Sequence, residues 1–155
     1  LRLVGSEMCI RDRLTGVYSM YSFMEHCKQY DEYNGSVAVV VCDINHLSDI
    51  NIQYGQKAGN QALINVAGVL KKILMDRAYI ARINEGNFVA VMKNVTDAEA
   101  GKTFEQIKRI VEKECNNGKF GVTIEYGIAM RKASNRWIMD IVHEAVNDMR
   151  DRKGR

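Results

Sequence analysis

A carboxylate at the end of a buried strand is the first feature of this sequence that could do chemistry. Asp43 follows residues 37–42, a run of small and β-branched apolar side chains that is typical of a strand buried on both faces. Beyond Asp43, apolar residues recur at helical spacing over 47–54, and Gly55 stands where such a helix would end. An acid in this position suits a metal or phosphate site, although Asp43 could equally cap the helix that follows.

The elements that must position Asp43 are a mixture of helices and strands. Asn34-Gly35 is a turn signal before the central strand, and Asn60 and Thr96 stand at the expected starts of two amphipathic helices. The sequence predicts helices over 18–33, 47–54, 60–74, 96–113 and 134–151, and strands over 36–42, 78–83, 87–92 and 122–130. This order predicts one α/β (α+β) domain of the ferredoxin-like palm type, with an antiparallel-containing sheet and flanking helices.

Length and composition restrict the class of protein. The chain has 155 residues, 46% of them apolar and 26% charged, which suits one globular domain with its own core. No apolar run approaches the roughly 18 residues that span a bilayer. A formal charge of +3 with scattered basic residues gives no reason to expect a nucleic-acid partner. The four cysteines show no metal-ligand spacing, so a reducing cytoplasm is the expected location of this segment.

The sequence around Asp43 resembles the centre of a GGDEF domain, the diguanylate cyclase family. That family carries Asp-x-Asp-x-Phe-Lys-x-Ile-Asn-Asp-x-x-Gly-His-x-x-Gly-Asp at this point. The positions that match are Asp43, Ile50, Asn51, Gly55 and Gly59, with Leu47 in place of Phe and Asn60 in place of the last Asp. Residues 14–17 and 122–129 also resemble family segments, so the resemblance covers 14–155. It implies the palm fold that nucleotide cyclases share with polymerases.

The resemblance implies a specific chemistry. In the family, two domains meet as a dimer, each holding one GTP with Mg²⁺, and each 3′-hydroxyl attacks the other nucleotide's α-phosphate to give cyclic di-GMP. The implied metal ligands are the strand-end acid, here Asp43, the backbone carbonyl of Ile44, and two acids in the Gly-Gly-Asp/Glu-Glu-Phe hairpin. The protein's part in such a reaction is to position phosphates and neutralise their charge.

The hairpin of this chain departs from the family at four of its five positions. It falls at Asn84-Glu85-Gly86-Asn87-Phe88, so both glycines and both acids are lost and only Phe88 is kept. A Mg²⁺ site built on Asp43 and the Ile44 carbonyl alone would be weak. Glu85 is not expected to compensate, because a shift of one residue along a strand turns a side chain to the other face.

Base and phosphate contacts are only partly kept. Asn51 matches the family's guanine-contacting asparagine, whereas Asn60 replaces an aspartate and offers one acceptor oxygen beside a donor. Both asparagines could equally be helix caps. Arg150 aligns with a phosphate-contacting lysine, which keeps the charge and changes the geometry. The family's inhibitory Arg-x-x-Asp falls at Met75 and Ala78 and is therefore absent.

Residues 1–13, LRLVGSEMCIRDR, fit none of these patterns. They lack the apolar segment of a signal peptide. Residues 3–12 resemble the conceptual translation of a transposase sequencing adapter. We therefore interpret residues 1–13 as a non-native or disordered tail and residues 14–155 as the GGDEF domain.

These observations predict a catalytically degenerate GGDEF domain in bacterial cyclic di-GMP signalling, acting as a regulatory, dimerising or GTP-sensing module rather than an enzyme. The alternative is an active diguanylate cyclase with a non-standard motif. No cofactor is required, and Mg²⁺ enters only with residual GTP binding. The expected partners are GTP, a second copy of the chain or a neighbouring signalling domain, with no membrane contact in this segment. His26, His46 and His143 show no ligand spacing and are expected to face solvent.

Overall fold

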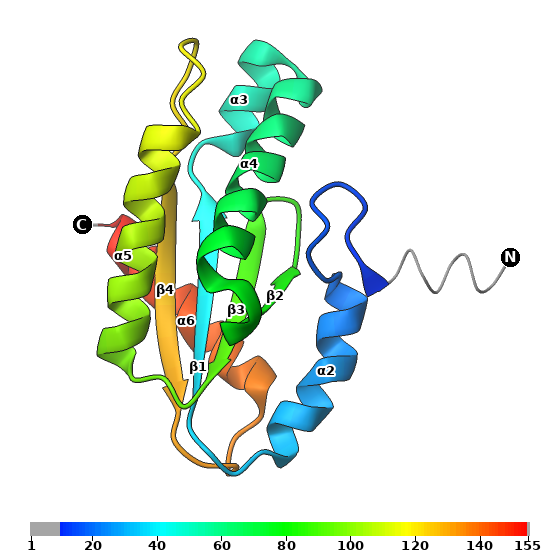
Figure 1. The fold of residues 1–155 in the computed structure, drawn as a ribbon, viewed down its shortest axis with the longest axis vertical. Helices are drawn as coiled ribbons and strands as arrows, with labels where there is room; N and C mark the ends of the chain where they lie inside the picture. Colours follow the sequence, from blue (N-terminus) through cyan, green and yellow to red (C-terminus); the bar gives the residue numbers. More distant parts are fainter. Residues whose placement is uncertain (1–9, 155) are drawn as a thin grey trace, which may run out of the picture.

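A computed structural model describes residues 10–154 of the chain. These residues form one four-stranded sheet with helices on both faces (Figure 1). The elements in chain order are α2 (Met20–Glu32), β1 (Val37–Ile44), α3 (Leu47–Tyr54), α4 (Gln56–Leu74), the short 3₁₀ helix η1 (Met75–Arg77), β2 (Tyr79–Arg82), β3 (Asn87–Lys93), α5 (Asp97–Glu114), β4 (Ile124–Arg131) and α6 (Ile138–Lys153). The strand order is β2-β3-β1-β4, and every neighbouring pair is antiparallel. The predicted α/β class and flanking helices are confirmed.

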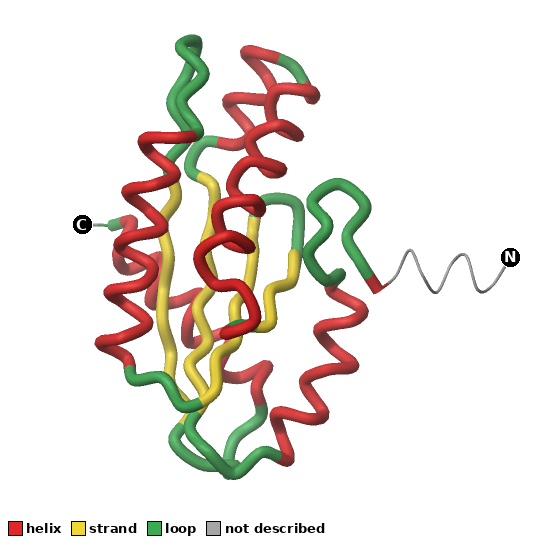
Figure 2. The backbone as a smooth tube through the Cα atoms, viewed as in Figure 1, coloured by secondary structure: helices red, strands yellow, loops and turns green. Residues whose placement is uncertain are grey.

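The sheet separates two layers of core. Figure 1 shows α4 and α5 over one face, with α6 and α2 toward the other, and Figure 2 shows that most loops lie at the strand ends. Residues 37–42 of β1 alternate between the two layers, and each is at most 2% exposed, as predicted for a strand buried on both faces. Apolar side chains of these strands and helices fill both layers, and the buried ones include Val39, Val41, Leu63, Val66, Leu70, Ile80, Val89, Val91, Ile107, Val111 and Ile128.

The start of α3 corrects one prediction about Asp43. The strand β1 continues through Asp43 to Ile44, and the N-cap residue of α3 is His46, with a left-handed φ of 59° and no side-chain cap. The interpretation of Asp43 as a helix cap is therefore wrong. Its carboxylate lies at the end of the sheet and does not cap α3.

The cap roles proposed for the two asparagines are also wrong. Asn51 lies inside α3, and Asn60 lies inside α4, which begins at Gln56 rather than at residue 60. One residue, Gly55, both ends α3 and begins α4, and its φ of 95° is a conformation that favours glycine. By contrast, the capping box of α5 is present as predicted, with Thr96 and Glu99 bonded to each other's backbone.

Residues 10–13 contact the domain. The Asp12 carboxylate accepts hydrogen bonds from the Thr15 hydroxyl at 2.6 Å and from the Arg82 guanidinium at 3.3 Å. The first nine residues of the proposed tail lie outside the described residues, and the non-native origin of residues 1–13 stays a prediction.

Both outer strands of the sheet have neighbours along their free edges. Beside β2, the Tyr18 amide donates to the Ile80 carbonyl at 3.0 Å, and the Arg82 amide donates to the Tyr18 carbonyl at 2.9 Å. Beside β4, the Ile128 amide donates to the Asp148 carboxylate of α6 at 2.8 Å. At these positions the backbone groups of the outer strands are bonded within the chain instead of facing solvent.

The helix α6 lies in direct contact with the backbone of β4 at Gly127. A Cβ atom built on Gly127 would overlap the carbonyl oxygen of Ala145 and the amide nitrogen of Met149, both backbone atoms of α6. Only glycine permits this approach, since the nearest atoms are backbone and cannot rotate away. The contact fixes the distance of α6 from the sheet.

We predict that Gly127→Ala lowers the free energy of unfolding by about 1–3 kcal/mol, because α6 must shift away from the sheet. The matched control is Gly68→Ala, since a Cβ at this exposed position in α4 has nothing within 4 Å. The control should raise stability by about 0.5–1 kcal/mol through helix propensity. Urea denaturation of both variants measures the difference, and equal effects would contradict the close contact.

Candidate functional site

The structure brings the hairpin of residues 84–88 beside the end of β1, as predicted. Asp43 pairs with Asn87 in the antiparallel register of β1 and β3, and the Ile44 amide donates to the Gly86 carbonyl at 3.2 Å. A Cβ built on Gly86 would lie 3.4 Å from Oδ1 of Asp43 and 3.1 Å from Leu47. Asp43 and the hairpin therefore form one site at this end of the sheet.

The turn of the hairpin is closed by its own side chains. Oδ1 of Asn84 accepts hydrogen bonds from the amides of Gly86 at 3.2 Å and Asn87 at 3.0 Å. The guanidinium of Arg82 donates to the carbonyl oxygens of Asn84 at 3.2 Å and Glu85 at 2.8 Å. Two turn amides that could meet an anion are thus already bonded within the chain.

The hairpin adds no carboxylate to Asp43. Gly86 has no side chain, and Nδ2 of Asn87 points to the Cys42 carbonyl at 3.5 Å. The Glu85 side chain is exposed. Among residues 10–154, no group of three or more His, Cys, Asp or Glu side chains is arranged to hold a metal ion. The residues present at this site therefore do not fit the divalent cation that the family implies.

A lysine that the sequence analysis did not single out contacts Asp43. Nζ of Lys153, in the last turn of α6, forms an ion pair with Oδ2 of Asp43, and their side chains are 36% and 24% exposed. Arg150, the basic residue of this helix that aligns with the family's phosphate-contacting lysine, is exposed. Helical spacing could have predicted this contact. Lys153 follows the buried residues Ala145 and Met149 by eight and four positions, so it lies on the same face of the helix.

A second carboxylate near Asp43 was also missed. Glu125 of β4 is paired with Asp43 in the antiparallel register of β1 and β4. Its two oxygens bond elsewhere, one to the amide of Tyr126 at 3.1 Å and the other to Nζ of Lys108 at 3.3 Å. Glu125 therefore binds the edge of its own strand and a lysine of α5 rather than sharing a ligand position with Asp43.

The two asparagines proposed for base recognition lie where α3 meets α4. The Asn51 side chain packs on Gly59, where any Cβ would overlap its Oδ1, and this oxygen is buried with no hydrogen-bond partner among residues 10–154. Oδ1 of Asn60 accepts a hydrogen bond from Gln56 at 3.0 Å. Guanine recognition through these residues would require Asn60 to leave Gln56 and the Asn51 amide to turn outward, and it stays a prediction.

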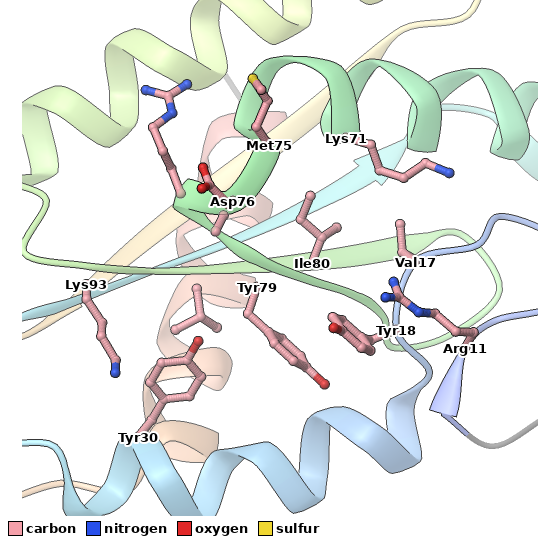
Figure 3. Close-up of a pocket in the computed structure, with 13 residues that line it drawn as sticks. Arg11, Val17, Tyr18, Tyr30, Lys71, Met75, Asp76, Tyr79, Ile80 and Lys93 are labelled. Atoms are coloured by element: carbon pink, nitrogen blue, oxygen red, sulfur yellow. The ribbon is translucent and has the colours of Figure 1, made fainter. Parts of the chain in front are cut away.

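A separate pocket of about 570 Å³ lies between α2, β2 and the end of α4 (Figure 3). Its lining combines tyrosines with basic residues, namely Tyr18, Tyr30, Tyr79, Lys71, Arg77 and Lys93. Met75 and Ala78, the positions of the missing Arg-x-x-Asp, also line it. Neither Asp43 nor the hairpin borders this pocket.

His26, which lies next to this pocket, is less exposed to solvent than predicted. His26 is half-buried and stacks on Tyr79 with ring centroids 4.1 Å apart, whereas His46 and His143 are exposed as expected. Burial, with a smaller effect from the Lys93 charge, lowers the pKa of His26. The residue therefore contributes an aromatic contact and tends toward its neutral form.

The chain is similar to known proteins in sequence and in fold. The sequence model of a family described as "Diguanylate cyclase, GGDEF domain" matches residues 9–155. The uncharacterized protein YhcK of Bacillus subtilis is 31% identical over 127 residues, which are 76% of this chain and 35% of YhcK. The probable diguanylate cyclase DgcF of Escherichia coli O157:H7 is 26% identical over 133 residues, which are 83% of this chain and 28% of DgcF. This chain therefore spans about a third of the length of these relatives.

A solved structure shares the fold over nearly the whole chain. The crystal structure of the coiled coil and GGDEF domain of DgcB from Caulobacter crescentus, in complex with c-di-GMP, superposes with a TM-score of 0.86. The identity is 21%, and the superposition covers 99% of this chain and 87% of the other. None of the helices within residues 10–154 is both long and apolar enough to cross a membrane.

We predict that Asn84→Ala opens the hairpin turn, because two backbone amides lose their acceptor. The free energy of unfolding should fall by about 1–2 kcal/mol, and hydrogen exchange should accelerate at the amides of Gly86 and Asn87. A matched control is Asn117→Ala, since Oδ1 of Asn117 accepts from the amides of Lys119 and Phe120 at 3.0 and 3.1 Å in another loop. Unchanged exchange at Gly86 and Asn87 in Asn84→Ala would show that the turn does not depend on this side chain.

Proposed function

Because the chain belongs to the diguanylate cyclase family of GGDEF domains, we propose that it acts as a catalytically silent regulatory module in bacterial cyclic di-GMP signalling. The observation that carries the proposal is the state of Asp43, whose carboxylate is paired with Lys153 beside a hairpin that supplies no second acid. The GGDEF chemistry described above depends on cations to neutralise triphosphate charge. Asp43 alone is a poor basis for such a cation site.

The closed turn of the hairpin supports the same proposal. Side chains at Asn84 and Glu85 stand where the family has glycines, and glycine there would let the backbone approach a nucleotide. Asn84 instead bonds the amides of Gly86 and Asn87. A phosphate could reach these amides only by displacing Asn84, so the hairpin is better suited to stable folding than to nucleotide contact.

A silent domain of this kind would act through contact with another domain. We propose that its partner is a second copy of the chain or a neighbouring signalling domain in a longer protein. The length of the curated relatives leaves room for such a neighbour, since this chain covers 35% and 28% of the first two. The DgcB structure offers a parallel, because it contains a coiled coil in addition to a GGDEF domain.

We predict no detectable cyclic di-GMP when the chain is incubated with GTP and either Mg²⁺ or Mn²⁺ and the products are separated by chromatography. An active GGDEF protein serves as the positive control for the assay. Turnover by the unchanged chain that disappears in Asp43→Ala would contradict the proposal. It would instead support the alternative of an active diguanylate cyclase with a non-standard motif.

A GTP-sensing version of the silent module is favoured by the unpartnered oxygen of Asn51. A buried acceptor without a donor costs stability, and a ligand that supplied the donor would recover that cost. Asn60 lies nearby in the second turn of α4, so both candidate base contacts share the junction between α3 and α4. In this version GTP binds through its base and needs little contribution from metal.

We predict that GTP at about tenfold its Kd stabilises the chain by roughly 1.4 kcal/mol, which raises the melting temperature by several degrees. The shift should be larger with GTP than with ATP, vanish in Asn51→Ala, and persist in Asp43→Ala and in EDTA. A second variant, Asn60→Ala, has Asn65→Ala as its matched control. Asn65 accepts from Gln61 at 2.9 Å in the same type of contact, one turn further along α4. Loss of the shift in EDTA would reveal a working metal site, and no shift at millimolar GTP would favour a pure interaction domain.

A further inference from the structure

We propose that Lys153 supplies a permanent, covalently attached cation at Asp43, and that this ammonium excludes divalent cations from the site. The inference deepens the proposed silent role, on which it rests, by naming the group that keeps the surviving acid from binding metal. It starts from the disagreement between the family's Mg²⁺ requirement and the residues present at this end of the sheet.

The position of Lys153 is set by the packing of α6. The helix is held at its start by the Asp31 carboxylate, which accepts from the Ile138 amide at 2.8 Å. It touches the sheet at Gly127, between Ala145 and Met149. Side chains four residues apart share one face of a helix, so Ala145, Met149 and Lys153 form a row toward the sheet. The first two are 0% and 5% exposed, and Lys153 ends the row beside Asp43.

The local charges favour this contact. Lys153 lies in the last turn of α6, where the helix dipole stabilises a positive side chain. Because both side chains are partly shielded from solvent, the pair is screened less by salt than a fully exposed pair would be. A tethered ammonium also has a high effective concentration at Asp43, whereas a free cation must compete from bulk solution.

The neighbouring oxygens cannot readily complete a metal site around Asp43. Glu125, opposite Asp43 in the sheet, is bonded to Lys108 and to the Tyr126 amide. Asn87 turns its amide nitrogen to the Cys42 carbonyl. A divalent cation would therefore have to displace Lys153 and would still find a single free carboxylate, which is too few charged ligands for strong binding.

The test measures Mn²⁺ binding to the 155-residue chain without nucleotide, by electron paramagnetic resonance of free Mn²⁺. Lys153→Met removes the ammonium, and Lys153→Glu replaces it with a second carboxylate beside Asp43. We expect Lys153→Glu to bind Mn²⁺ at least tenfold more tightly than the unchanged chain, with Lys153→Met between the two. Adding Asp43→Asn to Lys153→Glu should return the affinity to that of the unchanged chain.

The control for charge alone is Lys113→Glu, which changes the net charge equally at an exposed position of α5. It should leave Mn²⁺ affinity within about twofold of the unchanged chain, and thermal unfolding without metal shows that each variant is folded. Equal Mn²⁺ affinity in the unchanged chain and in folded Lys153→Met overturns the inference even if Lys153→Glu gains affinity, because the gain would then come from the added carboxylate alone. A gain that survives Asp43→Asn also overturns it.

The outcome is separable from that of the proposed function. Cyclic di-GMP made from GTP by the unchanged chain would refute the silent role. A failure of the Lys153 variants to gain Mn²⁺ affinity, with no cyclic di-GMP made, would refute only the role of Lys153 as the excluding cation.

Discussion

The burial of β1 on both faces is the constraint on which the rest of the structure depends. A strand with no solvated face must have a strand on each side and a helical layer above and below, and the order β2-β3-β1-β4 with its four long helices supplies both. Asp43 is the first polar side chain along this strand, and it lies where the helical cover ends. The position of the Asp43 carboxylate at this end of the sheet is therefore set by the packing of the core around β1.

Much of the fold could be predicted from the sequence, because apolar periodicity decides which faces are buried. The pattern in residues 37–42 predicted β1, and Thr96 with Glu99 predicted the start of α5. The start of α4 was missed by four residues, since residues 56–59 contain no large apolar side chain and the chain turns at Gly55 within a single residue. Local pattern cannot show that two helices share one junction residue.

The candidate site was predicted less completely than the fold, because its contacts join residues distant in sequence. The position of the hairpin beside Asp43 was confirmed. The ion pair between Asp43 and Lys153 spans 110 positions and depends on the depth at which α6 packs on Gly127. Glu125 was missed for a related reason, since only strand register places it opposite Asp43. Sequence spacing identified the candidate groups, and packing decided which of them meet.

The occupied edges of the sheet have a consequence for how this domain can associate. Tyr18 bonds along β2, and Asp148 of α6 bonds along β4, so neither outer strand offers a continuous row of free backbone groups to another chain. Joining two copies by extending the sheet across their boundary would require one of these attachments to break first. Assembly that keeps both attachments would use side chains on helices and loops, so that surface substitutions which do not disturb the core could change its affinity and its choice of partner.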